Sequence, residues 1–184
     1  MRTLQTCFMM LSIMTSCSEE PKASSDSQFG IDYYQFDEHK LESYGIDASI
    51  MIPNETAGIG ASFECKIEPK EGFKWVITNG KNFKILIEDY GDYQYKMPEF
   101  IRKELEYQDI FKTEIIEQKE NYVVYKRELN LSSNTTSSYH LYGIKYINGV
   151  YYEIKNDDEE GNTKKVIDFI LKSFLSFKSL NSSI

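Results

Sequence analysis

The chain has 184 residues, of which 41% are hydrophobic and 27% charged, a composition typical of one globular domain with a single core. Its 14 Tyr and 11 Phe against 10 Gly and 4 Pro favour a strand-rich fold and exclude disorder for the bulk of the chain. The formal net charge is −8, and no window clusters enough Lys and Arg to follow a phosphate backbone. We therefore expect no nucleic-acid partner.

The first residues have the pattern of a secretory leader. Arg2 precedes a short apolar run from about Cys7 to Met14, and the small polar residues Thr15 and Ser16 follow. The run is far shorter than the roughly 20 apolar residues of a membrane-spanning helix. A buried core helix is the alternative, although no helix start or amphipathic face is visible.

Met14-Thr15-Ser16-Cys17 resembles the bacterial lipobox, whose cysteine is acylated and becomes the mature N-terminus, with Met14 where Leu is usual. Ser18-Glu19-Glu20 is similar to the acidic export signal of Bacteroidetes lipoproteins. These resemblances imply that residues 1–16 are a signal peptide and that Cys17 carries a lipid. They also imply attachment in the cell envelope, at the outer membrane, on its periplasmic or surface-exposed side.

Residues 17–43 are expected to form a polar, lipid-anchored tether, because the chain after Cys17 is Ser-rich and irregular. A single domain is expected over 44–178 and a disordered tail over 179–184. With Cys7 in the leader and Cys17 acylated, Cys65 is the one cysteine left, so no intramolecular disulfide is expected.

Alternating apolar residues predict a strand over 46–52 and a weaker one over 62–67. An Asn-Gly pair at 79–80 predicts a hairpin. A two-residue turn there would set apolar against polar side chains, whereas a three-residue loop over 79–81 places the apolar ones on one face. The loop pairs Ile77 with Phe83, Trp75 with Ile85 and Phe73 with Ile87.

The second half begins with a helix expected over 97–108, where Pro98 suits the first turn. Strands are predicted over 113–118 and 122–129, and a loop over 132–138. A two-residue turn at Asn148-Gly149 pairs Ile147 with Val150, Lys145 with Tyr152 and Gly143 with Ile154. Apolar residues at helical spacing predict a closing amphipathic helix over 162–177.

This order predicts an α+β fold, with an antiparallel sheet of about seven or eight strands covered by two main helices in an α/β/α sandwich-like arrangement. With its early YGIDASIMIP strand and long last helix, it resembles the PsbP-like and DcrB-like group of small lipoproteins and lumenal proteins over about 44–177. The resemblance implies a noncatalytic, accessory role and supplies no fixed set of site residues.

The face of the 148–149 hairpin opposite the predicted core carries His140, Tyr142, Tyr146 and Tyr151, which are the candidate binding residues. Tyrosine offers large, half-polar contact area at low entropic cost, which suits protein or sugar contacts. The alternative, which is favoured, is that the closing helix covers them. His140 is also expected to lie across from Asp157, where an ion pair would raise its pKa and allow pH sensing.

No catalytic or metal-binding set stands out. No base lies near Cys65 in the sequence. The two alternatives for this residue are a catalytic dyad with His140 and an unreactive, packed thiol. The acidic run 156–162 resembles a calcium loop, but Ile167 stands where the bidentate Glu is required. We therefore expect an acidic turn before a helix, no zinc site, no cofactor and no enzyme activity.

Two functions remain open. The first is a noncatalytic envelope lipoprotein that binds another envelope protein or supports an assembly, with a monomeric domain and an exposed aromatic patch. The second is a small-ligand or lipid binder with an apolar cavity between sheet and helix.

Overall fold

The computed structural model of the whole chain describes residues 31–93, 99–101, 103, 110–130, 137–157 and 162–181. The predicted signal peptide, Cys17, most of the calcium-like run and most of the 132–138 loop lie outside the described residues. So does most of the predicted 97–108 helix, of which residues 99–101 and 103 are helical. Residues 31–184 form one compact unit.

The described strands form two sheets in which every pairing is antiparallel. The smaller sheet has the order β1-β2-β10 and consists of β1 (Phe36–Lys40), β2 (Ala48–Pro53) and β10 (Lys178–Ser179). The larger sheet has the order β3-β4-β5-β9-β8-β7-β6. Its strands are β3 (Cys65–Lys70), β4 (Lys74–Asn79), β5 (Phe83–Asp89), β6 (Phe111–Gln118), β7 (Tyr122–Leu129), β8 (Ser137–Ile147) and β9 (Val150–Asn156). Two 3-10 turns, η1 (Glu42–Tyr44) and η2 (Glu55–Ala57), flank β2.

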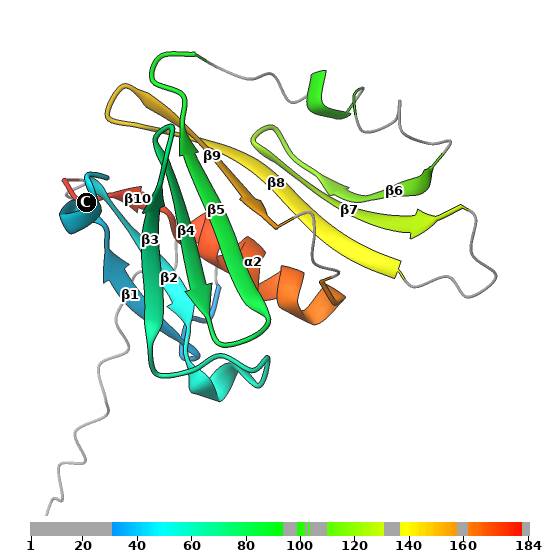
Figure 1. Cartoon of the computed structure of the whole chain (residues 1–184), viewed down its shortest axis with the longest axis horizontal. Helices are drawn as coiled ribbons and strands as arrows, with labels where there is room; N and C mark the ends of the chain where they lie inside the picture. Colours follow the sequence, from blue (N-terminus) through cyan, green and yellow to red (C-terminus); the bar gives the residue numbers. More distant parts are fainter. Residues whose placement is uncertain are drawn as a thin grey trace, which may run out of the picture. The chain divides into compact units, whose positions relative to one another are not determined.

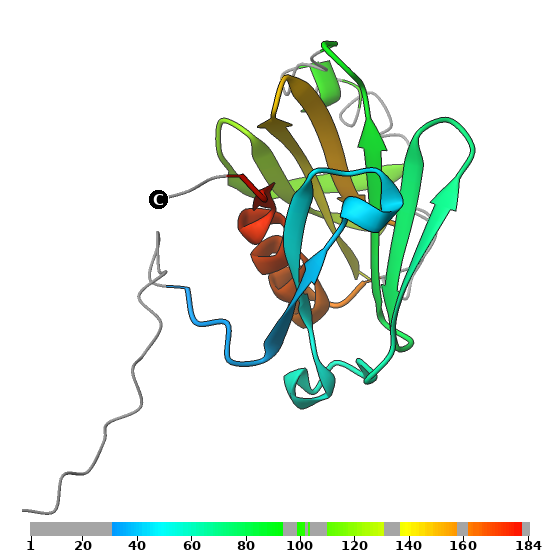
Figure 2. The same cartoon turned by 90° about the vertical axis from the view of Figure 1, so that its left-hand side faces the viewer.

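The small sheet and the helix α2 (Lys164–Ser176) pack against the same face of the seven-stranded sheet (Figures 1 and 2). We call this face the inner face and the opposite one the outer face. Helix α2 contacts β2, β5, β8 and β9, so it closes the side of the core that the small sheet leaves open. This core includes Ile50 and Ile52 of β2, Ile85 and Ile87 of β5, and Phe174 of α2, each at most 1% exposed.

Helix α2 confirms the predicted closing helix. The Thr163 side chain caps it by accepting a hydrogen bond from the Val166 amide at 3.4 Å. One stripe of the helix is buried, consisting of Val166, Ile167, Phe169, Ile170, Ser173 and Phe174.

The α+β class and the antiparallel sheet are confirmed, but the predicted cover of helices is wrong. Much of the second layer on the inner face is itself a small sheet, because the alternating residues of β2 pair with β1 and β10. The predicted boundaries at 43 and 179 are also wrong. Phe36 and Leu41, placed in the tether, are 6% and 0% exposed, and Ser179, placed in the tail, belongs to β10.

The two Asn-Gly pairs had different outcomes. At Asn148-Gly149 the predicted pairing is confirmed in full, and both turn residues have positive φ, at 51° and 87°, as a two-residue hairpin turn requires. At 79–80 the predicted register is wrong, since Asn79 pairs with Phe83 and Ile77 with Ile85. The loop has three residues, but they are 80–82.

Side-chain hydrogen bonds explain the shift. The Asn79 carboxamide is 3% exposed, accepts from the Ser62 amide at 2.8 Å and donates to the Pro53 carbonyl at 2.8 Å. It therefore extends β4 by one residue beyond the expected turn. Phe73, expected on the core face, instead lies in the β3–β4 turn at φ 57° and is 74% exposed.

Candidate functional site: the outer face and its tyrosine patch

The four predicted binding residues all lie on the outer face of β8 and β9, but the structure divides them. His140 and Tyr142 are 1% and 2% exposed, whereas Tyr146 is 62% exposed and Tyr151 is half-buried. His140 and Tyr142 are therefore covered, as the favoured alternative expected, whereas Tyr146, near the hairpin turn, is accessible and its role in binding stays a prediction.

The buried half is a second, smaller core. Tyr142 packs with Val123, Tyr125 and Ile144, and the Phe100 ring stacks on the Tyr142 ring at 3.7 Å between centroids and 8° between planes. The cover predicted for these tyrosines was the closing helix, which instead lies on the inner face. The helical residues around Phe100 cover them here.

Polar groups in this second core are satisfied internally. The Tyr142 hydroxyl donates to Glu153 Oε2 at 2.9 Å, and Lys155 Nζ donates to Glu153 Oε1 at 2.8 Å. A buried carboxylate that carries both a hydroxyl and an ammonium partner needs no ligand to satisfy it.

His140 is held in the same way. Its Nε2 lies 2.8 Å from Ser138 Oγ, its Nδ1 lies 3.3 Å from Asn156 Nδ2, and its ring stacks on Tyr125 with centroids 5.1 Å apart. Asp157, the expected ion-pair partner, contacts the Lys84 ammonium. These contacts give His140 a structural role in the sheet.

The exposed end of the outer face carries a cluster that we call the tyrosine patch, consisting of Tyr90, Tyr93, Tyr146 and Tyr151. The Tyr146 and Tyr151 rings face each other across the β8–β9 hairpin at 4.5 Å, and the Tyr90 and Tyr93 rings lie 6.5 Å apart. Tyr93 and Tyr146 are 60% and 62% exposed. Sequence reasoning missed Tyr90 and Tyr93, although each stands beside a Gly-Asp turn directly after a predicted strand.

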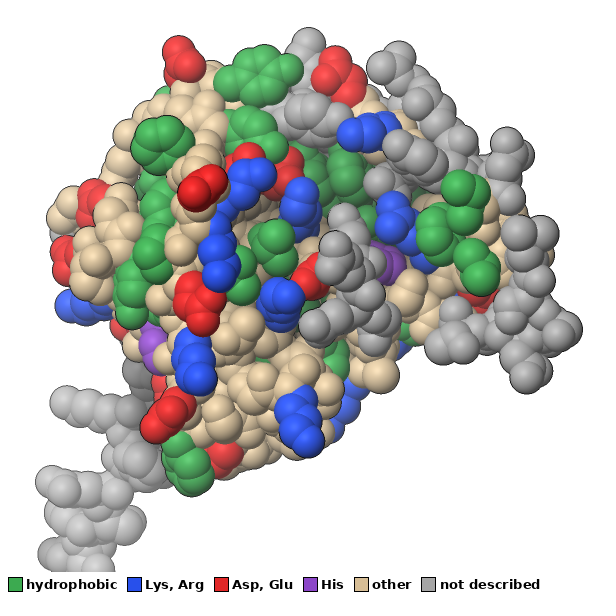
Figure 3. Space-filling model, viewed as in Figure 1, with side chains coloured by type: hydrophobic (Ala, Val, Ile, Leu, Met, Phe, Trp, Pro, Cys, Tyr) green, Lys and Arg blue, Asp and Glu red, His purple; other side chains and the backbone are tan. Residues whose placement is uncertain are grey.

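Backbone hydrogen bonds fix the two halves of the patch to each other. The Tyr90 amide donates to the Tyr151 carbonyl at 2.9 Å, and the Tyr151 amide donates to the Gly91 carbonyl at 2.7 Å. The Gly91 amide in turn donates to Asp89 Oδ1 at 2.7 Å. In Figure 3, acidic side chains flank the hydrophobic ones at the top of the molecule, above the end of β5 and the β8–β9 hairpin. The result is a preformed aromatic surface with an acidic border.

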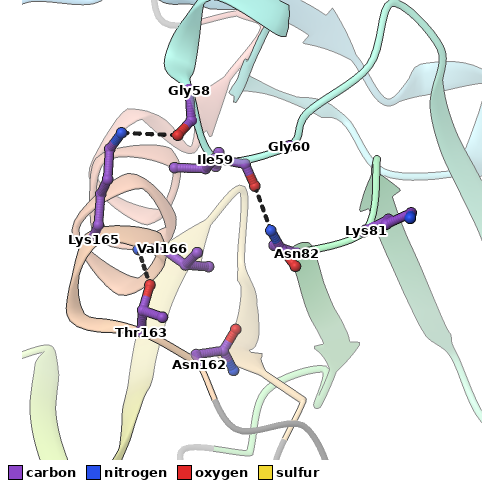
Figure 4. A pocket seen from close by; sticks show the side chains of 9 residues that line it. All are labelled: Gly58, Ile59, Gly60, Lys81, Asn82, Asn162, Thr163, Lys165 and Val166. Atoms are coloured by element: carbon purple, nitrogen blue, oxygen red, sulfur yellow. Dashed lines mark hydrogen bonds between the residues drawn. The ribbon is translucent and has the colours of Figure 1, made fainter.

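A separate pocket of about 370 Å³ lies where the start of α2 meets the β4–β5 loop and the segment 58–60 (Figure 4). Lys165 Nζ donates to the Gly58 carbonyl at 2.9 Å, and Asn82 Nδ2 donates to the Ile59 carbonyl at 2.7 Å. The lining residues are Gly58, Ile59, Gly60, Lys81, Asn82, Asn162, Thr163, Lys165 and Val166. With only Ile59 and Val166 as apolar side chains, the pocket is more polar than the apolar cavity expected from the sequence.

The Cys65–His140 dyad is excluded. Cys65 lies on β3 and His140 on β8, which is four places away in the strand order and hence about 19 Å at the usual strand spacing. Burial raises the pKa of the Cys65 thiol to about 11, so it stays protonated at neutral pH.

Among the residues that the structure describes, no group of His, Cys, Asp and Glu side chains has the geometry to hold a metal ion. Within the same described ranges, no helix has the length and apolarity to cross a membrane. Comparison of the chain with protein-family models and with curated proteins gives no match.

Proposed function

We propose that this protein is a noncatalytic binding module, held at the cell envelope by a lipid on Cys17, which docks a partner protein on the tyrosine patch. The observation that carries the proposal is the patch itself, in which aromatic side chains from two separate segments are exposed and fixed in place by backbone hydrogen bonds. Rigid tyrosines lose little side-chain entropy on binding, and they are enriched at protein interfaces.

The charge around the patch favours a basic partner. Asp92 lies in the turn that carries Tyr90 and Tyr93, and the whole chain has a net charge of −8. A partner surface that presents Arg or Lys would complement the acidic border and could stack guanidinium groups on the tyrosine rings.

The docking test compares two pairs of exposed aromatic residues. Affinity purification from native membranes would use the wild-type chain, a Tyr93→Ser/Tyr146→Ser variant and a matched control, Tyr34→Ser/Phe63→Ser, whose residues are 74% and 86% exposed outside the patch. We expect a stoichiometric partner with the wild type and the control, and at least a tenfold loss with the patch variant. Equal retention by all three chains, or no stoichiometric partner, would contradict the proposal.

The anchor is tested separately. Intact mass of protein extracted from membranes should show loss of residues 1–16 and added acyl chains, and Cys17→Ser should release the protein from the membrane fraction. A membrane-bound Cys17→Ser variant with an unmodified mass would rule out the lipid.

A second candidate function follows from the 370 Å³ pocket. Its lining suits a small polar ligand better than an acyl chain, because most of the lining side chains are polar and an acyl chain could not replace the hydrogen bonds that these groups make with water. Native mass spectrometry of protein from its own membrane would show a bound mass beyond the lipid. Lys165→Met should reduce it, and Lys164→Met, at the exposed neighbouring position, should not.

A further inference from the structure

The two edges of the seven-stranded sheet differ in how well they are protected. The β3 edge carries Pro69 together with exposed Lys66, Glu68 and Lys70, features that discourage pairing with another strand. The β6 edge also carries exposed charges, Lys112 and Glu114, and a β-bulge between Ile115 and Glu117, but it has no proline. Of the nine large hydrophobic side chains exposed in the described part of the chain, four lie on β6 or beside its first residues, namely Ile110, Ile115, Ile116 and Leu129.

Figure 3 shows hydrophobic side chains gathered at the right of the molecule, over the end where β6 begins and β7 finishes. Among the strands that the structure describes, β6 pairs with β7 on one side and has no neighbour on the other. An exposed apolar edge strand is a template for pairing with another strand.

The outward-pointing backbone groups of β6 can be assigned from the ladder with β7. The Asn130 amide donates to the Ile110 carbonyl directly opposite, at 2.9 Å. In an antiparallel ladder such hydrogen-bonded pairs alternate with pairs whose N–H and C=O groups point away. Counting from Ile110, the backbone N–H and C=O groups that point away from β7 belong to Phe111, Thr113 and Ile115.

We propose that β6 pairs with β6 of a second copy of this chain, antiparallel and centred on Thr113, so that the two seven-stranded sheets join into one. In this register Thr113 faces the partner's Thr113, and Phe111 faces the partner's Ile115. All three outward-pointing residues then find hydrogen-bonding partners. This inference goes beyond the proposed docking function and replaces the expected monomer.

Charge complementarity selects this register. Centred on Thr113, Lys112 lies opposite the partner's Glu114, and the symmetry of the dimer repeats the pair. A shift of the centre to Lys112 or to Glu114 would place two like charges face to face and leave one outward residue of each chain unpaired. Each alternative therefore loses both hydrogen bonds and charge pairs.

The charges on β7 extend the same pattern. Lys126 Nζ lies 4.0 Å from Glu114, and Lys112 lies opposite Glu128 in the β6–β7 register. Across the joined edge the signs would alternate in one row: Lys126, Glu114, the partner's Lys112 and the partner's Glu128. A row of alternating charges across a sheet stabilises each neighbouring pair.

The test uses sedimentation velocity on residues 31–184, the compact unit that contains both cores, from about 1 to about 200 µM. One strand pair makes a small interface, so we expect a monomer–dimer equilibrium with a dissociation constant in the micromolar range. Lys112→Glu and Glu114→Lys should each weaken self-association at least tenfold, because each places like charges opposite one another. Lys66→Glu, the matched change on the β3 edge, should leave it unchanged.

Mixing provides the decisive measurement. In a mixture of the Lys112→Glu and Glu114→Lys chains, both cross-edge pairs again have opposite signs, so the two variants should form a heterodimer that neither forms alone. Circular dichroism spectra that match the wild type confirm that the variants are folded. A wild type that is monomeric at about 200 µM, variants that dimerise like the wild type, or a mixture that stays monomeric would each overturn the proposal.

Discussion

Gly143 on β8 allows the Phe174 ring of α2 to pack directly on the sheet. A Cβ at position 143 would lie 2.4 Å from Cε2, 2.7 Å from Cζ and 2.9 Å from Cδ2 of that ring. Because Gly143 does not have positive φ, alanine can adopt its backbone conformation, and the effect of Gly143→Ala is purely steric.

The size of the stability loss depends on how firmly the Phe174 ring is held. Phe174 is fully buried, with the Tyr122 ring at 5.6 Å and the Lys145 ammonium at 4.8 Å from its centroid. The ring would need to move by about 1 Å to reach ordinary contact, and overpacking of this kind costs about 1–3 kcal/mol. Glycine to alanine in an unobstructed strand would instead stabilise by about 0.5–1 kcal/mol. We therefore expect a net loss of about 1 kcal/mol, opposite in sign to the unobstructed case.

Urea unfolding followed by fluorescence of Trp75, the one tryptophan, measures this change. A loss of about 1 kcal/mol lowers the midpoint by about 0.5 M for a domain of this size. The Gly143→Ala/Phe174→Leu chain should lose less than the sum of its two single variants, because the smaller side chain leaves room for the new methyl group. A Gly143→Ala chain as stable as the wild type, or strictly additive losses, would refute the steric argument.

Three further predictions concern single side chains. Asn79→Ala should lower the free energy of unfolding by about 2–4 kcal/mol, because it leaves the Pro53 carbonyl without its partner. The control Asn82→Ala, at an exposed position, should cost under about 1 kcal/mol. Comparable urea midpoints for the two variants would contradict this. Burial raises the pKa of the Cys65 thiol to about 11. Cys65 should therefore react with iodoacetamide at pH 8 about 100 times more slowly in the native chain than in urea. Equal rates would mean that the thiol is not shielded. Burial raises the pKa of Tyr122 from 10.0 to about 12, with a smaller contribution from its hydrogen-bonded carboxylate. The contribution of this group to stability should therefore be constant below pH 10 and should fall as the pH rises from 10 to about 12. Urea midpoints at pH 8 and 11 test this. Between these pH values the midpoint of the Tyr122→Phe chain should fall less than that of the wild type, and an identical fall would assign the effect to other groups.

The two hairpins show which parts of the fold could be predicted. At Asn148-Gly149 the local turn preference and the apolar pattern of the strands agree, and the register follows from them. At Asn79 the same dipeptide has a buried carboxamide whose partners, Ser62 and Pro53, come from other elements. Such partners exist only once the chain has folded, so local preference could not place the turn.

The candidate site shows the same limit. Alternation correctly placed His140, Tyr142, Tyr146 and Tyr151 on one face, because side-chain direction in a strand has a period of two. It could not say which of them are covered, because Phe100 reaches the face from a separate segment. The small sheet was missed for the same reason, since β1 is short and mostly exposed and β10 has two residues.

The C-terminal strand gives the fold a late closing step. β10 pairs with β2, and Asn148 Nδ2 donates to both Asp47 Oδ2 at 2.7 Å and Ser179 Oγ at 3.0 Å, so segments more than a hundred positions apart along the chain meet there. Contacts of such long range slow folding, since distant segments must meet before any stabilising contact forms between them. A chain delivered N-terminus first therefore has neither its small sheet nor the α2 side of its core until nearly all of it has emerged. Under the export that we propose, that delay would keep the chain unfolded during its passage through a channel, with folding on the far side.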